Sequence, residues 1–288
     1  MQSRRIGDTQ VSAIGLGGMP MSVKGRPADE QQSVDTIHAA LDAGVTFFDT
    51  ADAYSLDDAD FGHNESLIAR AIASWSGDTS DVLVATKGGH TRAEGGGWGL
   101  NGDPDYLKQA CEASLKRLGV DAIGLYQFHR PDPDVDYADS VGAIRDLLDA
   151  GKIRYAGISN ANPDQIRLAN DVLGGRLVSV QNQFSPAFRS SDPELALCDE
   201  LGIAFLPWSP LGGIAKAGEL GSHFASFAEV AQARDVSPQQ VCLAWMLAKS
   251  PVVIPIPGSS RPATIRDSAA AVHLELTGDE IARLDAAG

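Results

Sequence analysis

Four residues whose side chains could together deliver a proton to a substrate stand at or near the ends of short apolar runs. They are Asp49, Tyr54, Lys87 and His129. Addition of hydride to a carbonyl leaves an alkoxide that needs a proton, and a tyrosine can supply it near neutral pH if its pKa is lowered. A nearby lysine ammonium favours the phenolate and lowers that pKa. A carboxylate can hold the ammonium in place, and a histidine can orient the carbonyl oxygen or relay the proton.

Each of these residues also has a purely structural interpretation. Asp49 could be a helix cap, Tyr54 a half-buried core aromatic, Lys87 a solvated strand end and His129 a satisfied loop histidine. Their joint placement favours catalysis, because all four follow successive predicted strands. The carboxyl ends of the strands are where a (β/α)8 barrel builds its active site.

The elements that must position these residues alternate between strand-like and helix-like segments. The opening residues predict a hairpin around Gly7 and Asp8, followed by a first barrel strand at 13–17. Further strands are expected at 45–49, 81–87, 122–129, 152–159, 176–184, 202–208 and 251–257. Helices are expected at 28–44, 63–75, 103–119, 136–151, 163–172, 193–201 and 237–249.

About eight strand and helix units predict an α/β fold, because parallel strands need crossovers and the helices cover the outer face of the sheet. We therefore expect a single-domain (β/α)8 TIM barrel with an N-terminal β-hairpin, spanning residues 1–288. A doubly wound open sheet is the main alternative. Against it, no glycine-rich turn joins the first strand tightly to a helix, and the GLGGMP segment ending at Pro20 lacks the third glycine of a dinucleotide fingerprint.

Composition narrows the range of partners. A formal net charge of −15 leaves no basic stripe for nucleic acid and would be repelled by an anionic membrane surface. No leader peptide or membrane span is expected, which indicates a cytoplasmic protein. The cysteines Cys111, Cys198 and Cys242 fall in helix-like apolar patterns and are expected to be buried free thiols.

Several other motifs point away from metal or phosphate chemistry. His63, His90 and His129 lack the paired spacing of a zinc site, so no metal is expected. The GGGWG stretch that begins at Gly95 is not followed by Lys-Ser or Lys-Thr and is expected to be a mobile loop beside the site rather than a phosphate loop.

Seven motifs occur in order along the chain: DTADAY, TKGG, FHRPD, GISN, VQNQF, PWSPLGG and IPGSSR. With them the sequence resembles the aldo-keto reductases over nearly its whole length. The resemblance implies an extended nicotinamide cofactor that lies across the barrel mouth without a Rossmann domain. It implies carboxamide contacts from Ser159, Asn160 and Gln181, ring stacking by Trp208, and pyrophosphate contacts near Ser209, Leu211 and Gly213. Amide groups suit a carboxamide and an indole face suits a flat heterocycle.

The resemblance also implies that the adenosine end of the cofactor lies at the segment 254–270. The sequence departs here from the usual family pattern, because Gly258 stands where many members carry a lysine, and Thr264 and Ser268 replace a usual arginine and asparagine. Ser259 and Arg261 remain, and a guanidinium at a strand-to-helix turn can pair with a 2′-phosphate. NADPH is therefore the expected cofactor, with NADH possible.

The expected function is NADPH-dependent reduction of an aldehyde or ketone, with Tyr54 as general acid. The alternative is a nucleotide-sensing or regulatory protein of the same fold that turns over slowly. The expected partner is a small carbonyl compound, and the expected state is a monomer, although a weak homo-oligomer is compatible with the sequence. The pocket rim is expected to include Met19, Trp98, Arg130 and Phe184.

Overall fold

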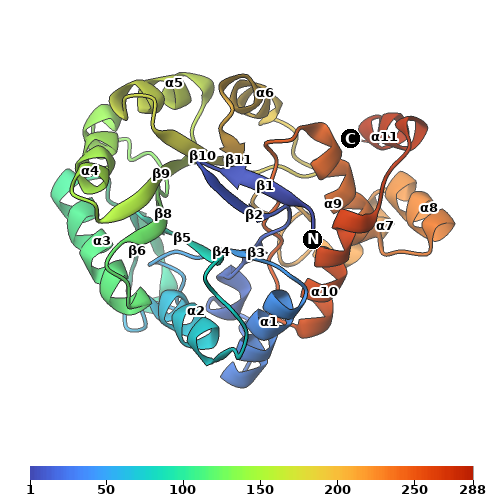
Figure 1. Cartoon of the computed structure of the whole chain (residues 1–288), viewed down its shortest axis with the longest axis horizontal. Coiled ribbons are helices and arrows are strands. Elements are labelled where there is room, and N and C mark those ends of the chain that lie inside the picture. The colour runs from blue at the N-terminus through green and yellow to red at the C-terminus, as the bar shows by residue number, and fades with distance from the viewer. Residues whose placement is uncertain (288) are drawn as a thin grey trace.

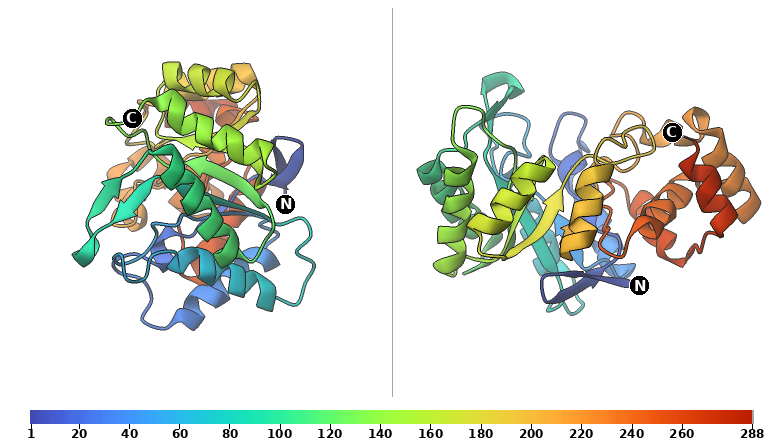
Figure 2. Two further views of the ribbon diagram at one scale, coloured as in Figure 1. Left: turned by 90° about the vertical axis from the view of Figure 1, so that its left-hand side faces the viewer. Right: turned by 90° about the horizontal axis from the view of Figure 1, so that it is seen from above.

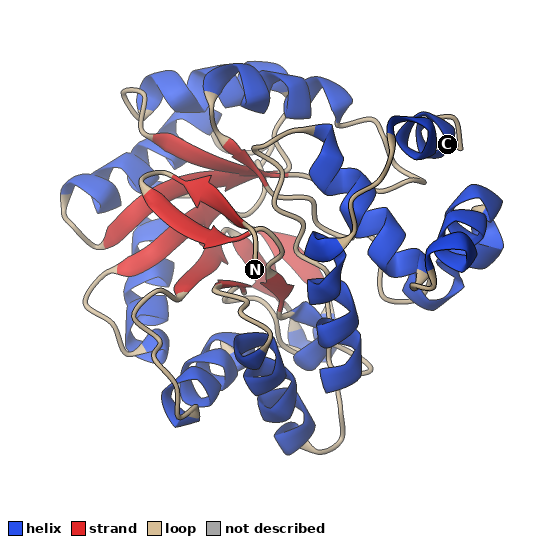
Figure 3. Cartoon of the chain, turned by 45° about the vertical axis from the view of Figure 1, so that its right-hand side comes forward, coloured by secondary structure: helices blue, strands red, loops and turns tan. Residues whose placement is uncertain are grey.

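Seven parallel strands form the curved central sheet of the computed structural model, which describes residues 1–287. Helices surround the outer face of this sheet (Figures 1 and 3). The hydrogen-bonded order is β11-β10-β9-β8-β5-β4-β3. The strands are β3 (Leu16–Gly17), β4 (Phe47–Asp49), β5 (Leu83–Gly88), β8 (Ile123–Phe128), β9 (Ile153–Ser159), β10 (Leu177–Gln181) and β11 (Ala204–Phe205).

The expected eighth strand is replaced by an irregular segment that closes the ring between β11 and β3. Its backbone pairs with Phe205 through Val253 and with Gly17 through Gly258. The carbonyls of Pro255 and Pro257 accept hydrogen bonds from β3 and the residue before it. Because proline has no N–H to donate, the two prolines cannot continue a regular ladder, although the chain still completes the barrel.

The helices that cover the barrel are fixed by local capping signals. Asp103 accepts hydrogen bonds from the N–H groups of Asp105 and Tyr106, as expected for an N-cap before Pro104. Asn162 forms a capping box with Gln165. The main helices are α1 (Glu30–Asp42), α2 (His63–Ser74), α3 (Pro104–Leu118), α4 (Tyr137–Asp149), α5 (Pro163–Val172), α6 (Asp192–Leu201), α9 (Pro238–Lys249) and α10 (Pro262–Ala270).

Additional helices follow the later strands and were not expected from the sequence. α7, α8 and α11 lie beside α9 at the edge of the molecule (Figure 1). They are α7 (Leu220–His223), α8 (Ala225–Arg234) and α11 (Gly278–Asp285), with single 3-10 turns η1 (Met19–Met21), η2 (Glu94–Gly96), η3 (Ala217–Glu219) and η4 (Ala271–His273). None of the helices within residues 1–287 combines the length and apolarity that a bilayer crossing requires.

Two β-hairpins stand at opposite ends of the barrel (Figure 2). The expected N-terminal hairpin pairs β1 (Ser3–Ile6) with β2 (Thr9–Ser12) across a Gly7 with a φ of 59°. The second hairpin pairs β6 (His90–Arg92) with β7 (Trp98–Leu100). The glycine-rich segment at Gly95, expected as a loop beside the site, forms the turn of this hairpin, and its mobility stays a prediction.

Apolar side chains fill the barrel and the layer between sheet and helices. The largest buried cluster joins strands β8 to β11 with the helices outside them and includes all three cysteines, which are free and buried as expected. A separate cluster under the β1–β2 hairpin contains Ile6, Val11 and Phe47 and seals the amino-terminal end of the barrel. A cavity inside the barrel can therefore open only at the carboxyl ends of the strands.

Candidate active site

Lys87, Asp49 and Tyr54 form a buried contact at the carboxyl ends of β4 and β5. Lys87 Nζ donates to Asp49 Oδ2 at 2.7 Å, to the carbonyl of Thr50 at 2.8 Å and to Tyr54 Oη at 3.2 Å. The Lys87 side chain is 0% exposed. A buried ammonium is stable only when it is paired and hydrogen-bonded. Asp49 and the Thr50 carbonyl provide that pairing, and the third N–H direction points at the tyrosine oxygen.

The pKa of Tyr54 in this contact shifts in the direction opposite to the one expected from the sequence. Burial raises the pKa of Tyr54, and the charge of Lys87 opposes this rise without reversing it. Burial alone would lower the pKa of Lys87, but Asp49 and Tyr54 raise it, so the ammonium stays charged. The expected lowering of the tyrosine pKa is therefore wrong, because desolvation by burial outweighs the lysine charge. Tyr54 is a protonated hydroxyl at neutral pH.

His129 follows β8 and is a neutral imidazole. Burial, with the positive charge of Lys87, holds its pKa well below 6.5. Its Nδ1 is buried without a hydrogen-bond partner among the described residues. A buried N–H without an acceptor is rarer than a free acceptor, so the proton belongs on Nε2. The ring lies 5.8 Å from that of Tyr54, centroid to centroid, so one substrate oxygen can meet both groups.

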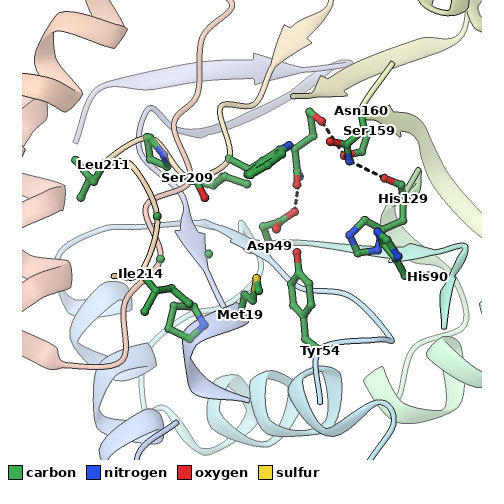
Figure 4. Close-up of a pocket in the computed structure, with 18 of the residues that line it drawn as sticks. Met19, Asp49, Tyr54, His90, His129, Ser159, Asn160, Ser209, Leu211 and Ile214 are labelled. Carbon is green, nitrogen blue, oxygen red and sulfur yellow. Dashed lines mark hydrogen bonds between the residues drawn. The ribbon is translucent and has the colours of Figure 1, made fainter. Parts of the chain in front are cut away.

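A cavity of about 340 Å³ opens above these residues. Figure 4 shows Tyr54 and Asp49 at its inner end, His129 on one flank and Leu211 with Ile214 on the other. Its volume falls in the range of small-molecule sites. Most of the sequence-predicted residues line it: Met19, Asp49, Tyr54, Trp98, His129, Arg130, Ser159, Asn160, Gln181, Trp208, Ser209, Leu211, Gly213 and Gly258. Lys87 lies behind this wall and contacts the cavity-lining Tyr54.

The predicted carboxamide-binding residues form one hydrogen-bond network. Gln181 Nε2 donates to Asp49 Oδ1 at 2.7 Å, and Ser159 Oγ donates to the carbonyl of Gln181 at 2.7 Å. Asn160 Nδ2 donates to the carbonyl of His129 at 3.0 Å and to Ser159 Oγ at 3.0 Å. Asn160 has a φ of 57°, a left-handed conformation that asparagine adopts more readily than most residues and that this network holds in place. Gln181 Oε1 has no hydrogen-bond partner among residues 1–287 and can face a ligand in the cavity.

The loop after β11 forms the opposite flank. Trp208 lines the cavity, and its backbone N–H donates to the carbonyl of Asn182 at 3.0 Å. Ser209 has a φ of 49° and Gly213 a φ of 95°, so the backbone between them turns tightly around the cavity. Leu211 and Gly213 complete this turn.

Besides Lys87, three predicted residues lie outside the cavity. Phe184 is wrong as a rim residue, because it is 0% exposed and packs between Phe205 and Trp245 in the core. Ser259 is buried, and its Oγ donates to the carbonyl of Arg261 at 3.1 Å. Arg261 is exposed at the N-terminus of α10, beyond Gly258, so its role stays a prediction.

Sequence reasoning missed His90 as a lining residue. It was considered only as a metal ligand, and no group of metal-binding side chains is present in the described part of the chain. The structure brings its ring to 4.2 Å from that of His129, centroid to centroid. The available signal was position, because His90 stands three residues after Lys87 at the same end of the barrel. Apolar lining from Ile214 and Ile256 was also missed.

The chain is similar to known oxidoreductases in both sequence and structure. A model of the Aldo/keto reductase family matches residues 13–288. An uncharacterized oxidoreductase of Schizosaccharomyces pombe is 33% identical over 289 residues, 99% of this chain and 89% of that protein. A 6-dehydroglucose reductase of Novosphingobium aromaticivorans is 35% identical over 274 residues, 92% of this chain and 87% of that protein. A solved aldo/keto reductase from Klebsiella pneumoniae, in complex with NADP and acetate, has a TM-score of 0.81 at 28% identity and covers 99% of this chain and 94% of its own.

Proposed function

Because this chain belongs to the aldo/keto reductase family, we propose that it reduces an aldehyde or ketone to the alcohol with NADPH, and that Tyr54 is the general acid. The observation that carries the proposal is the contact of Lys87 Nζ with Asp49 and Tyr54 at the inner end of the cavity. A charged lysine and a protonated phenol in contact, beside a neutral histidine, suit proton delivery to a developing alkoxide.

The cavity fits a nicotinamide group. Gln181 Oε1 and Ser159 can contact a carboxamide, and Trp208 presents an aromatic wall at the same level. Gly258 lines the cavity and packs closely against Pro20, because a Cβ there would lie 2.8 Å from Pro20 Cγ. A bound reduced nicotinamide would supply the hydride.

The protein's own groups perform the rest of the chemistry. Tyr54 Oη and His129 Nε2 donate hydrogen bonds to the carbonyl oxygen and orient it. As negative charge develops on that oxygen, Tyr54 transfers its proton to it. Lys87 stabilises the phenolate that remains, and Asp49 keeps the ammonium charged and aimed.

NADPH is proposed over NADH on two grounds. The similar protein of Klebsiella pneumoniae was solved with NADP. In this chain the exposed guanidinium of Arg261 lies at the N-terminus of α10, where backbone N–H groups also favour a phosphate. The substrate is a small carbonyl compound. Because one relative is named for 6-dehydroglucose, sugar carbonyls belong in the first panel of candidate substrates.

The test is carbonyl-dependent oxidation of NADPH by Tyr54→Phe. The variant should lose about 10²–10⁴-fold in kcat, because general acid catalysis typically contributes that much. Its affinity for NADPH, measured by quenching of tryptophan emission, should stay near the wild-type value. Tyr155→Phe is the matched control, because Tyr155 bonds Thr9 at the far end of the barrel and also loses only a hydroxyl.

Retention of most turnover by Tyr54→Phe would remove the tyrosine from this role. Wild-type protein that binds NADPH but never oxidises it with any reactive aldehyde would instead support the sensing alternative, which no feature of the cavity favours.

A further inference from the structure

His90 occupies a wall of the cavity beside the proposed reaction centre. Its ring stands edge-on to His129 at 4.2 Å and edge-on to Trp98 at 5.4 Å, centroid to centroid. Figure 4 shows the two histidines together on the same flank of the cavity that both line. A group bound at Tyr54 and His129 therefore has His90 as its next neighbour.

The hairpin fixes which nitrogen of His90 carries the proton. Nδ1 lies 3.0 Å from the carbonyl oxygen of Gly99, on the partner strand β7. A carbonyl can only accept, so Nδ1 is the donor. In the neutral ring, Nε2 then holds a lone pair and is an acceptor. Burial lowers the pKa of His90, which keeps the ring neutral at physiological pH.

The other polar groups at this end of the cavity are donors, are already engaged, or, as with Gln181 Oε1, are assigned above to the nicotinamide carboxamide. Tyr54 and His129 donate to the carbonyl oxygen, and the Arg130 guanidinium has only donors. Asn160 Oδ1 already accepts from Arg130 at 3.1 Å. Asp49 accepts from Lys87 and Gln181, each at 2.7 Å. His90 Nε2 makes no hydrogen bond within the described chain. It is also not one of the fully buried polar atoms that lack a partner, so it is the acceptor available to a substrate.

We propose that His90 is a specificity residue, whose Nε2 accepts a hydrogen bond from a hydroxyl on the carbon next to the substrate carbonyl. The protein would thus favour 2-hydroxy aldehydes and ketones over their deoxy counterparts. The inference rests on the proposed function, since it concerns the substrate of the same site.

The experiment compares lactaldehyde with propanal, which differ only in the 2-hydroxyl, using NADPH as reductant. We define the preference as the ratio of the two kcat/KM values. His90→Phe keeps a ring but removes the acceptor, so the preference should fall about threefold to tenfold, mainly through the KM for lactaldehyde. His90→Gln restores a side-chain oxygen and should recover part of it. His273→Phe, an exposed histidine on η4, is the matched control and should keep the wild-type ratio.

An unchanged preference in His90→Phe would overturn the proposal. A parallel loss on both aldehydes, with no change in their ratio, would also overturn it and would show that His90 only supports His129. If wild-type protein reduces neither aldehyde nor any other carbonyl, the proposed function itself fails, and this inference fails with it. Reduction of propanal without a dependence on His90 leaves the proposed function standing and removes only the role of His90.

Discussion

Single side chains at the inner end of the cavity owe their protonation states to burial more than to charge pairing. Tyr54 shows this most clearly, because its contact with Lys87 does not bring its pKa below the usual 10.0. His129 shows the opposite direction for the same reason, since burial disfavours the imidazolium. Both groups are neutral over a broad range around pH 7, and each can donate a hydrogen bond to a carbonyl oxygen.

This balance predicts an asymmetric pH dependence. Carbonyl reduction needs the protonated Tyr54, which is present below its raised pKa, and neutral His129, which is present above its lowered pKa. We expect kcat/KM for reduction at saturating NADPH to be flat from about pH 7 to 9. Alcohol oxidation with NADP needs the phenolate as base, so its rate should rise about tenfold per pH unit over the same range.

The measurement is a pair of pH profiles on the same preparation. A reduction profile that falls with a midpoint near pH 8 would contradict the prediction and would show that Lys87 dominates over burial once ligands are bound. His223→Gln, at an exposed histidine outside the cavity, provides a control for unrelated titrations.

At the scale of elements, the β6–β7 hairpin connects the cavity wall to the segment that carries Tyr54. Arg92 lies with its guanidinium carbon 4.0 Å from the centroid of the Trp98 ring. The same guanidinium donates to the carbonyls of Ser55, at 3.0 Å, and Leu56, at 2.5 Å. One side chain therefore holds both the exposed indole of the wall and the turn that follows the proposed acid.

Arg92→Ala should free the hairpin. Hydrogen bonds from a charged group contribute roughly 1.5–3 kcal/mol, so we expect the KM for the carbonyl substrate to rise about tenfold while kcat changes less. Amide exchange at 90–100 should become faster. Arg70→Ala is the control, because Arg70 pairs with Glu30 on the exposed side of α1. A loss in kcat as large as that of Tyr54→Phe would mean that Arg92 positions Tyr54 rather than Trp98.

The order of strands and helices could be predicted from the sequence because each unit carries its own signals. Asp103 with Pro104 starts α3, and apolar runs mark β4, β5, β8, β9 and β10. We expected a regular eighth strand at 251–257. The segment is irregular because Pro255 and Pro257 lack the N–H donors that a strand ladder needs. Phe184 was misplaced because an apolar residue just past a strand can turn to the core or to the cavity, and only the packing against Trp245 decides.

The four proposed catalytic residues could be found because each has a distinctive side chain at a strand end. His90 could not, because its value depends on the tautomer that Gly99 imposes, and that contact arises only when the glycine-rich segment folds into a hairpin. The direction of the Tyr54 pKa shift also required the structure, since the sequence shows the neighbouring charge but not the extent of burial.

At the scale of the whole molecule, the cavity is lined by residues from both the early and the late part of the chain. Met19 and Gly258 both line it, and the barrel closes between them through the bond from the N–H of Gly17 to the carbonyl of Pro257. A ligand that contacts β3 and the segment before α10 therefore crosses the seam of the barrel. Such a ligand binds the folded state only, so it should stabilise the entire fold.

This linkage gives a measure of cofactor choice that does not depend on turnover. At a concentration of about 100 times its Kd, NADPH should add about 2.7 kcal/mol and raise the Tm by roughly 5 °C. NADH at the same concentration should raise it by less, because it lacks the phosphate that Arg261 is proposed to bind. Arg261→Ala should reduce the Tm shift caused by NADPH to that of NADH and leave the shift caused by NADH unchanged.

Arg167→Ala, at an exposed arginine of α5, is the control and should change neither shift. Equal shifts for both cofactors in the wild type would show that the 2′-phosphate is not recognised. A preference that survives Arg261→Ala would place the phosphate elsewhere on α10, with Arg266 the next residue to replace.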